Sequence, residues 1–325
     1  MKKKIDAQGN VDHDPVWDAA EMVHAQVKNN SRKIWTALDG ENYWQGENKY
    51  NNFIVSDSTT SKINNLFQLS GRTVTDFHNL DSACASNGDG EKFSNEELVA
   101  KGFLNGNKDD IKGLINFVRG KDYFVYSGVC DDKDKVRISV LGDIYHSQVV
   151  EVGRPSANTL YTNTKQEAYY RAKNGYNTWS ASLANRKKTL YVGANDGMLH
   201  AFDAATGEER WGFVPPFIAS KLPELVNDSL DGLGGGNAKK GGTNAIFAVD
   251  GSPVIHDMYI RGINADTGLF NTSKGWHTIL MIPYGRGGRG YSVLDVTDPD
   301  LSLIHISEPT RLLSIAYAGV CVKKK

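Results

Sequence analysis

The feature that most constrains this sequence is a series of short apolar segments that occurs twice, in the same order. The first series consists of GDIYHSQVVEV, KKTLYVGA and DGMLHAFDAATG, and the second of VDGSPVIHDMYI, GWHTILMIP and GRGYSVLDVTDP. These segments are short, rich in β-branched and aromatic residues, and bounded by Gly, Asp and Asn, which indicates β-strands. Asp203 and Asp295 end the corresponding third segments, 295 − 203 = 92 residues apart.

A four-stranded unit repeated around an axis is typical of a β-propeller. The segment EERWGFVP supplies a fourth, outer strand of the first unit, and the second unit should have one just after Asp300. The repeat distance exceeds the ~40–50 residues of a plain blade, and we attribute the excess to an insertion at 215–244. We therefore predict a mainly β fold, in which residues 136–300 form a partial propeller of about two blades, the second incomplete.

Residues 1–135 have a different character, and we predict a mixed α and irregular N-terminal region. Asp14 and Pro15 suit the start of a helix that continues through Val27. The segment 32–38, RKIWTAL, is predicted to be a strand. A further helix is predicted from Asp109 to Val118, with Gly120 able to end it.

The last 25 residues, 301–325, differ in sequence character from the rest of the chain. They begin with LSLIHISEPTR, which resembles the conceptual translation of a sequencing-library adapter, and we exclude them as non-native. The alternative is a real strand, which Leu301, Leu303 and Ile306 would suit. Without this segment the chain has 37 − 4 = 33 Lys and Arg and 38 − 1 = 37 Asp and Glu.

This near-neutral balance argues against a general nucleic-acid or anionic-membrane binder. No apolar run reaches the ~18 residues of a membrane helix. The start, MKKK, is not followed by the apolar stretch of a signal peptide. The chain is then expected to be either cytosolic or an internal piece of a longer secreted protein.

Cys84 and Cys130 remain once Cys321 is set aside with the tail. Both lie in polar segments without a second Cys or His at metal-ligand spacing. A disulfide between them would fit an exported protein, and two separate thiols are the alternative.

The segment AFDAATGEERW fits the Ala-x-Asp-x-x-Thr-Gly-x-x-x-Trp pattern of quinoprotein propellers. Asp203 can accept hydrogen bonds from turn amides, Gly207 permits a tight turn, and Trp211 can pack on the neighbouring blade. These roles need no ligand, so one copy indicates a propeller and only weakly a quinone. We define the blade signature as Gly197, Asp203, Thr206, Gly207, Trp211 and Asp295.

Other candidate sites have structural interpretations. His146, which could bond Asp143 or a neighbouring strand, and His200, His256 and His277 lie on separate strand segments and are interpreted as structural. The acidic and amide residues at 81–91 and 105–110 lack the Gly and Glu positions of an EF-hand. GRGGRG precedes a strand instead of a helix, which excludes a dinucleotide loop. No nucleophile motif is visible, so we predict no enzyme and no metal or cofactor site within this chain.

Four ordered motifs, LGDIYHSQVVEVG, TLYVGANDGMLHAFDAATGEERWGFVP, VDGSPVIHDMYI and GRGGRGYSVLDVTDP, resemble the C-terminal propeller of the neisserial PilC-type proteins. The resemblance covers roughly residues 110–300. Gln148 stands where that family usually has proline, and Pro283 interrupts a normally Gly-rich strand end. The calcium-binding loop of the family lies in later blades, beyond Asp300, so no metal ligand is carried over.

The resemblance implies a non-catalytic protein of type IV pilus biogenesis that is also a tip-associated adhesin. Its implied partners are type IV pilins, minor pilins and a host-cell receptor, and its implied location is the pilus tip and outer membrane surface. Calcium is expected in the full-length protein, and this fragment is not expected to function alone. The alternatives are a quinoprotein dehydrogenase using pyrroloquinoline quinone, which would need repeated Trp motifs and vicinal cysteines, and a plain propeller that binds another protein.

Overall fold

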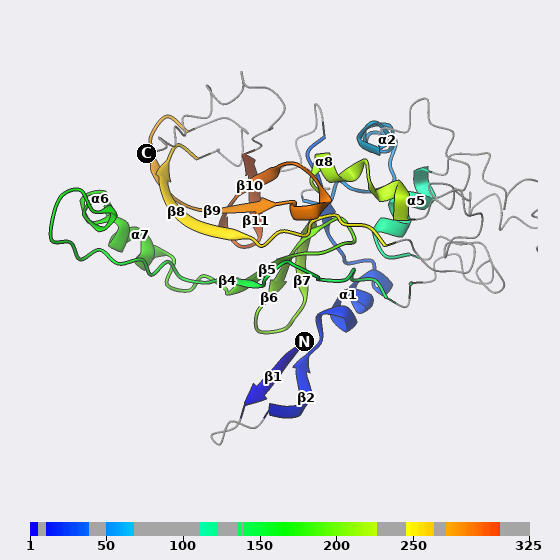
Figure 1. Cartoon of the computed structure of the whole chain (residues 1–325), viewed down its shortest axis with the longest axis horizontal. Helices are drawn as coiled ribbons and strands as arrows, with labels where there is room; N and C mark the ends of the chain where they lie inside the picture. Colours follow the sequence, from blue (N-terminus) through cyan, green and yellow to red (C-terminus); the bar gives the residue numbers. More distant parts are fainter. Residues whose placement is uncertain are drawn as a thin grey trace, which may run out of the picture.

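A computed structural model describes residues 1–5, 11–38, 50–67, 111–121, 136–137, 139–225, 245–262 and 271–305. Within these ranges the strands form a two-stranded hairpin, a five-stranded sheet and a four-stranded sheet, and the two larger sheets are stacked (Figure 1). The mainly β fold with two propeller blades is confirmed.

The five-stranded sheet has the order β3-β7-β6-β5-β4, and β4 to β7 form an antiparallel meander. β3 is added to the outer edge and runs parallel to β7, pairing Ile34 with Gly212 and Trp35 with Phe213. The strands are β3 (Ile34–Trp35), β4 (Val150–Val152), β5 (Thr189–Gly193), β6 (Leu199–Asp203) and β7 (Glu209–Phe213). A strand from the N-terminal region thus completes the first blade.

The four-stranded sheet is an antiparallel meander in the order β11-β10-β9-β8. Its strands are β8 (Val254–Ile260), β9 (Gly275–Pro283), β10 (Tyr291–Asp298) and β11 (Leu301–His305). Thr189 pairs with Asp203 in the first sheet, as Ile279 pairs with Asp295 in the second. The same strand order and antiparallel pairing indicate that the two sheets are copies of one unit.

β11 occupies the outer position of the second sheet, where the repeat predicts a fourth strand. It is built from residues 301–305, which the sequence interpretation set apart as an adapter. The backbone of residues 301–305 is therefore a β-strand, which is the alternative to an adapter given above. The adapter origin of 301–325 stays a prediction.

The central strands of the first sheet are buried on both faces. In β6, Leu199 and Ala201 face a core that is shared with the second sheet, whereas Phe202 packs with α1 (Ala19–Lys28) on the opposite face. Because successive side chains of a strand point to opposite faces, this arrangement produces the nearly continuous apolar run of the segment. α1 therefore covers the face of the first sheet that lies away from the second.

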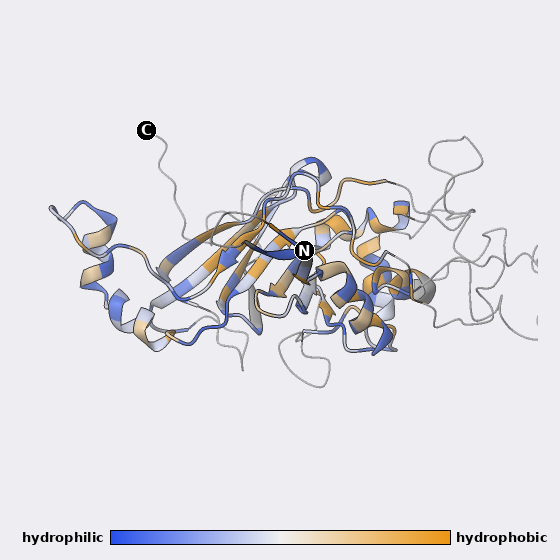
Figure 2. Ribbon diagram, turned by 90° about the horizontal axis from the view of Figure 1, so that it is seen from below, coloured by the Kyte–Doolittle hydropathy of each residue, from blue (hydrophilic) through white to orange (hydrophobic). Residues whose placement is uncertain are grey.

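The core between the sheets is rich in large buried aromatic side chains. Figure 2 shows hydrophobic residues gathered along the strands. The buried members are Trp35, Tyr50, Val152, Tyr191, Leu199, Ala201, Trp211, Phe213, Ile218, Ala248, Val249, Leu280, Ile282, Tyr284, Leu294 and Val296. Burial of this surface is the main force that holds one blade on the next.

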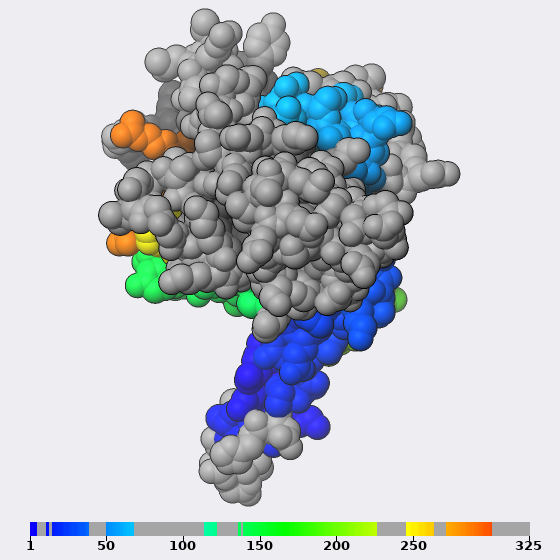
Figure 3. All heavy atoms as spheres, turned by 90° about the vertical axis from the view of Figure 1, so that its right-hand side faces the viewer, coloured from blue at the N-terminus to red at the C-terminus, as the bar shows by residue number. Residues whose placement is uncertain are grey.

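The N-terminal helix begins later than predicted. Asp14 and Pro15 belong to β2 (Val11–Trp17), which pairs with β1 (Lys2–Ile5) in a hairpin that projects from the body (Figure 3). The helix cap is Asp18, whose Oδ1 accepts a hydrogen bond of 2.8 Å from the Ala20 amide. A capping carboxylate one residue before the apolar stripe satisfies an otherwise unpaired amide, so it sets the helix start.

The remaining short elements are α2 (Thr60–Phe67), α5 (Ile111–Val118), α6 (Glu167–Lys173), α7 (Tyr176–Ser182), α8 (Pro216–Ala219), η1 (Leu222–Leu225) and η3 (Gly285–Gly287). α5 agrees with its prediction, and Gly120 follows it with a φ of 109°. Val136 makes a single bridge to Lys121, and the described residues that follow it, 137 and 139–141, belong to no strand.

Several predicted features lie outside the described residues. They are Cys84, Cys130, the polar stretches 81–91 and 105–110, and the Gly-rich loop 231–244. In the ranges that the structure does describe, no helix has the length and apolar character needed to cross a membrane.

Trp35 offers a test of how the N-terminal region joins the blade. Its fully buried ring lies 4.6 Å from the ring of Phe213 and 5.9 Å from that of Trp211, measured between centroids. We expect Trp35→Ala to lower the free energy of unfolding by about 3–5 kcal/mol, because it leaves a large cavity. Urea denaturation measures the change. The control is Val16→Ala on the hairpin, which should lower the free energy of unfolding by less than about 0.5 kcal/mol. Equal effects of the two variants would contradict the shared core.

Candidate functional site

The blade signature is built around the turn that joins β6 to β7. Asp203 Oδ1 accepts hydrogen bonds from the amides of Ala205 at 2.7 Å and Thr206 at 3.2 Å. The Thr206 hydroxyl accepts the Glu208 amide at 3.3 Å, and the Gly207 amide donates to the Asp203 carbonyl at 2.8 Å. Burial would raise the pKa of Asp203, but these amides lower it, so the turn holds an ionised carboxylate.

Two signature glycines occupy positions that other residues would not fit. Gly207 has a φ of 77°, and a Cβ there would lie 2.5 Å from the ring of Trp17. Gly197, in the turn from β5 to β6, has a φ of 99°, and a Cβ would lie 2.3 Å from Leu222. The left-handed backbone and the lack of space both require glycine.

The end of the signature connects the first sheet to the second. Trp211 is buried, and its Nε1 donates a hydrogen bond of 3.1 Å to the Pro299 carbonyl in the turn after β10. Arg210 donates to Asp203 of its own blade and to Asp300 of the next. Two neighbouring residues thus hold the same turn of the second blade, one by an indole and one by a guanidinium.

Asp295 takes the place of Asp203 in the second blade. Its Oδ1 accepts hydrogen bonds from the Thr297 amide at 3.0 Å and the Thr297 hydroxyl at 2.5 Å, while Oδ2 lies 2.6 Å from His277 Nδ1. In both signature aspartates, the carboxylate therefore accepts a hydrogen bond from the backbone amide two residues later in the chain. Asp295 and the other five signature residues do not gather at one point, since they serve successive turns and strands.

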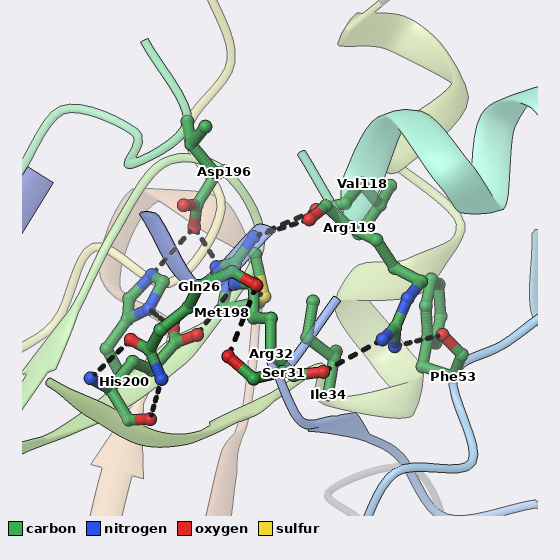
Figure 4. Close-up of polar contacts among 12 residues, drawn as sticks. Gln26, Ser31, Arg32, Ile34, Phe53, Val118, Arg119, Asp196, Met198 and His200 are labelled. Carbon is green, nitrogen blue, oxygen red and sulfur yellow. Dashed lines mark hydrogen bonds and ion pairs between the residues drawn. The ribbon is translucent and has the colours of Figure 1, made fainter. Parts of the chain in front are cut away.

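A buried ion cluster, defined here as Arg32, Asp196, His200 and Glu209, lies between the N-terminal region and the first blade (Figure 4). Arg32 Nε donates to Glu209 Oε2 at 2.6 Å, and Arg32 Nη2 donates to Oε1 at 3.1 Å. His200 Nδ1 lies 2.6 Å from Glu209 Oε1, and its Nε2 lies 3.1 Å from Asp196 Oδ1. Every member is bonded to another member, as buried charges require.

The protonation states follow from these contacts. Burial alone would lower the pKa of His200, but the carboxylates of Asp196 and Glu209 outweigh it and raise the pKa to about 9. Burial alone would raise the pKa of Glu209, but Arg32 and His200 hold it at about 2. The cluster therefore contains two cations and two anions, and its charges balance at neutral pH.

Further hydrogen bonds extend from the cluster to the N-terminal helices. Gln26 of α1 bonds the backbone of Glu209 in both directions at 2.8 Å. Arg32 Nη1 donates to the carbonyls of Val118 and Arg119 at 3.4 and 3.2 Å. Arg119 Nη2 in turn donates to the Arg32 carbonyl at 2.8 Å (Figure 4). The cluster is therefore a structural junction of α1, α5 and the blade.

The four strand-segment histidines each contact a carboxylate. His146 bonds Asp250 at 2.7 Å, so its partner belongs to the next blade and is not Asp143. His200 is the histidine of the ion cluster, and His277 bonds Asp295. His256 bonds Glu167 at 2.9 Å. Across the described ranges, no three His, Cys, Asp or Glu side chains are grouped so that they could hold a metal ion.

One prominent element was not predicted from the sequence. Residues 153–188, which we call the arm, connect β4 to β5, contain α6 and α7, and extend away from the sheets (Figure 1). Corresponding residues of the inner strands are 254 − 150 = 104 apart, whereas those of the third strands are 92 apart. The offset between the two blades is thus 12 residues larger for the inner strands than for the third strands. The first blade therefore has about 12 more residues between its inner and third strands than the second blade has, and this extra length was the signal for the arm.

The two stacked meanders and their signature turns define a β-propeller protein. Residues 141–307 match the family described as the PilY1 beta-propeller domain. Because this match covers 167 of 325 residues, the chain belongs to the PilY1 β-propeller family. The expected relation to pilus proteins of the PilY1 and PilC type is confirmed, and the neisserial branch stays a prediction.

Curated relatives are similar over the same part of the chain. A type IV pilus biogenesis factor PilY1 homolog from Xylella fastidiosa (strain Temecula1) is 35% identical over 185 residues, which are 57% of this chain and 13% of that protein. Type IV pilus biogenesis factor PilY1 from Pseudomonas aeruginosa (strain UCBPP-PA14) is 34% identical over 196 residues, 60% of this chain and 14% of the relative. This chain therefore matches only about a seventh of their length.

A solved structure also matches. The crystal structure of the Pseudomonas aeruginosa PilY1 C-terminal domain is 28% identical, with 47% of this chain and 24% of that chain covered and a TM-score of 0.28. The fold assignment rests on the sheets and on the family match. No finding supports the quinoprotein alternative.

The glycine of the signature turn provides a matched test. Gly175, between α6 and α7, also has a positive φ, of 70°, but nothing lies within 4 Å of the position that a Cβ would take. We expect Gly175→Ala to cost about 1–2 kcal/mol through backbone strain alone. Gly207→Ala should cost more, by about 1–3 kcal/mol, because the methyl group meets Trp17. Thermal unfolding compares them, and equal losses would contradict the packing of Trp17 on the turn.

The ion cluster predicts a pH dependence of stability. Since the pKa of His200 is raised above its unfolded value, its contribution is complete below about pH 6.5 and is lost as the pH rises through about 9. The loss should amount to about 3 kcal/mol. Urea unfolding at about pH 6 and about pH 9.5 should show this loss of stability in the wild type. The control His256→Gln changes an exposed histidine and should show the same loss. The His200→Gln variant should be less stable at pH 6 and show a smaller decline. Equal declines in all three would contradict a protonated His200.

Proposed function

We propose that this chain is part of a type IV pilus biogenesis factor in which the two blades act as a rigid, non-catalytic hub. The observation that carries the proposal is the PilY1 propeller match over 141–307, which coincides with the two stacked sheets. The curated relatives carry the name of type IV pilus biogenesis factors. Pilins and minor pilins are the partners that this function requires.

The physical character of the two blades supports a holding role. The sheets share an aromatic core, and Arg210 and Trp211 fix the turn of the second blade from the first. Buried charges in the first blade are balanced within the ion cluster. A unit of this kind keeps its shape under load, because the interior is close-packed and resists deformation.

We further propose that the complete protein acts outside the cell, at the pilus tip and outer membrane surface, and contributes to attachment through a host-cell receptor. This follows from the resemblance to the PilC-type adhesins. We also propose that the complete protein binds calcium, through residues other than those described.

The hub proposal is tested by unfolding the blade in the living cell. We expect Trp211→Ala, introduced at the chromosomal locus, to reduce surface pili to the level of a deletion strain, because loss of this buried ring costs about 3–5 kcal/mol. Immunoblots of sheared pilin measure the surface fraction, and whole-cell pilin should not change. Val16→Ala serves as the control. Normal surface piliation in a strain whose protein is protease-sensitive would overturn the proposal.

A further inference from the structure

The arm differs in charge from the rest of the chain. It contains seven basic residues and one acidic residue, Glu167, so its net charge is +6. The other 289 residues have 37 − 7 = 30 Lys and Arg and 38 − 1 = 37 Asp and Glu, a net charge of −7. The basic residues are Arg154, Lys165, Arg171, Lys173, Arg186, Lys187 and Lys188. Such segregation creates a local positive field on a slightly acidic molecule.

The base of the arm is fixed on the second blade. The Trp276 ring of β9 stacks with Trp179 at 6.0 Å, and its Nε1 donates a hydrogen bond of 2.8 Å to the Asn174 carbonyl. Tyr176 is buried and donates to Asp257 of β8 at 2.5 Å. Because these contacts anchor the α6–α7 junction and α7 itself, the arm is presented in one orientation.

The outer end of the arm carries exposed apolar and aromatic surface. Leu160 is 82% exposed and Tyr161 49%, and the Tyr161 ring lies 5.0 Å from that of Tyr169. Tyr170 is half-exposed, but its ring also contacts Tyr259 and Trp276 of the second blade. Lys165 and Lys173 are exposed and line one hollow with Tyr169, and Lys173 Nζ lies 6.0 Å from the Tyr169 ring. Figure 2 shows that α6, at the end of the arm, is otherwise mostly hydrophilic. Exposed leucine and tyrosine on a rigid support, bordered by lysines, have the composition of a protein interface with an apolar centre and a charged rim.

The distribution of the charges favours a protein partner over a continuous polyanion. Lys188 is paired with Glu151, Arg171 with Glu167, and Arg186 with Thr278. Lys165 and Lys173 line one hollow together with Glu167, Tyr169 and Tyr170, so the cations there are interspersed with an acidic and two aromatic side chains and form no row that follows a chain of phosphates or acidic sugars. A tyrosine and leucine centre is what a protein surface can bury.

We propose that the outer end of the arm docks on an acidic face of a type IV pilus subunit. The proposal rests on the proposed function, and it names the part of the chain that contacts the pilus. Leu160 and Tyr161 form the buried centre of the contact. Lys165 and Lys173 provide attraction across the rim, which raises the association rate and decreases with salt.

Charge reversal tests the rim. The chain is sedimented with purified type IV pili of the same organism at about 50 mM and about 300 mM NaCl. The double variant Lys165→Glu, Lys173→Glu should bind about tenfold more weakly at low salt and lose most of the salt dependence. The control Lys28→Glu, Lys33→Glu makes the same change of charge at exposed positions near α1 and should bind like the wild type.

A second variant tests the apolar centre. Leu160→Ser should weaken binding to the same pili about tenfold and keep the salt dependence of the wild type, because it removes contact area and no charge. Its circular dichroism and thermal unfolding should match those of the wild type, since Leu160 is exposed.

The outcomes separate the inference from the proposed function. Binding of the wild type that the arm variants do not reduce would overturn the arm inference and leave the pilus function in place. Failure of the wild type to sediment with pili would overturn both. Equal binding to heparin or to vesicles of anionic lipid would show a polyanion site and would also overturn the inference.

Discussion

Arg32 lies in the N-terminal region, yet its guanidinium is buried against Glu209 of β7. Separating the chain before the propeller from the first blade would break this pair and leave the buried Glu209 with His200 as its remaining counter-charge, and breaking a buried pair costs about 3–5 kcal/mol. His200 and Asp196 complete the balance, and Gln26 and Arg119 connect the cluster to the helices. The parallel addition of β3 and the burial of Trp35 depend on the same attachment. The N-terminal region is thus a structural part of the blade.

The sequence allowed the propeller to be predicted because its strands alternate and their turns repeat. Asp203 and Asp295 mark equivalent turns, and the equal strand order of the two sheets supports that alignment. The helix start was placed incorrectly, because Asp14 and Asp18 are both reasonable caps and only the pairing of β2 with β1 decides between them. The ion cluster could not be predicted, since Arg32 and Glu209 are 177 residues apart and Glu209 stands at an unspecified position of the AFDAATGEERW pattern. The arm was missed because its helices lack an apolar stripe.

The junction between the blades combines apolar contact with a few directed polar contacts. Trp211 contributes ring area to the shared core and also donates to the Pro299 carbonyl, so one residue provides both adhesion and register. His146 and Asp250 occupy equivalent positions in the two blades and bond each other directly. Directed bonds between matching positions fix the rotation of one sheet against the next, which apolar contact alone leaves free.

The position of α1 has a geometric consequence. In a ring of stacked sheets, each sheet has two faces on which a neighbour can pack, but one face of this first sheet is already covered by Val23, Val27 and Trp17. A further sheet that packed on this face would have to displace α1. The two outer faces of the pair of sheets therefore differ, because α1 covers the one that belongs to the first sheet.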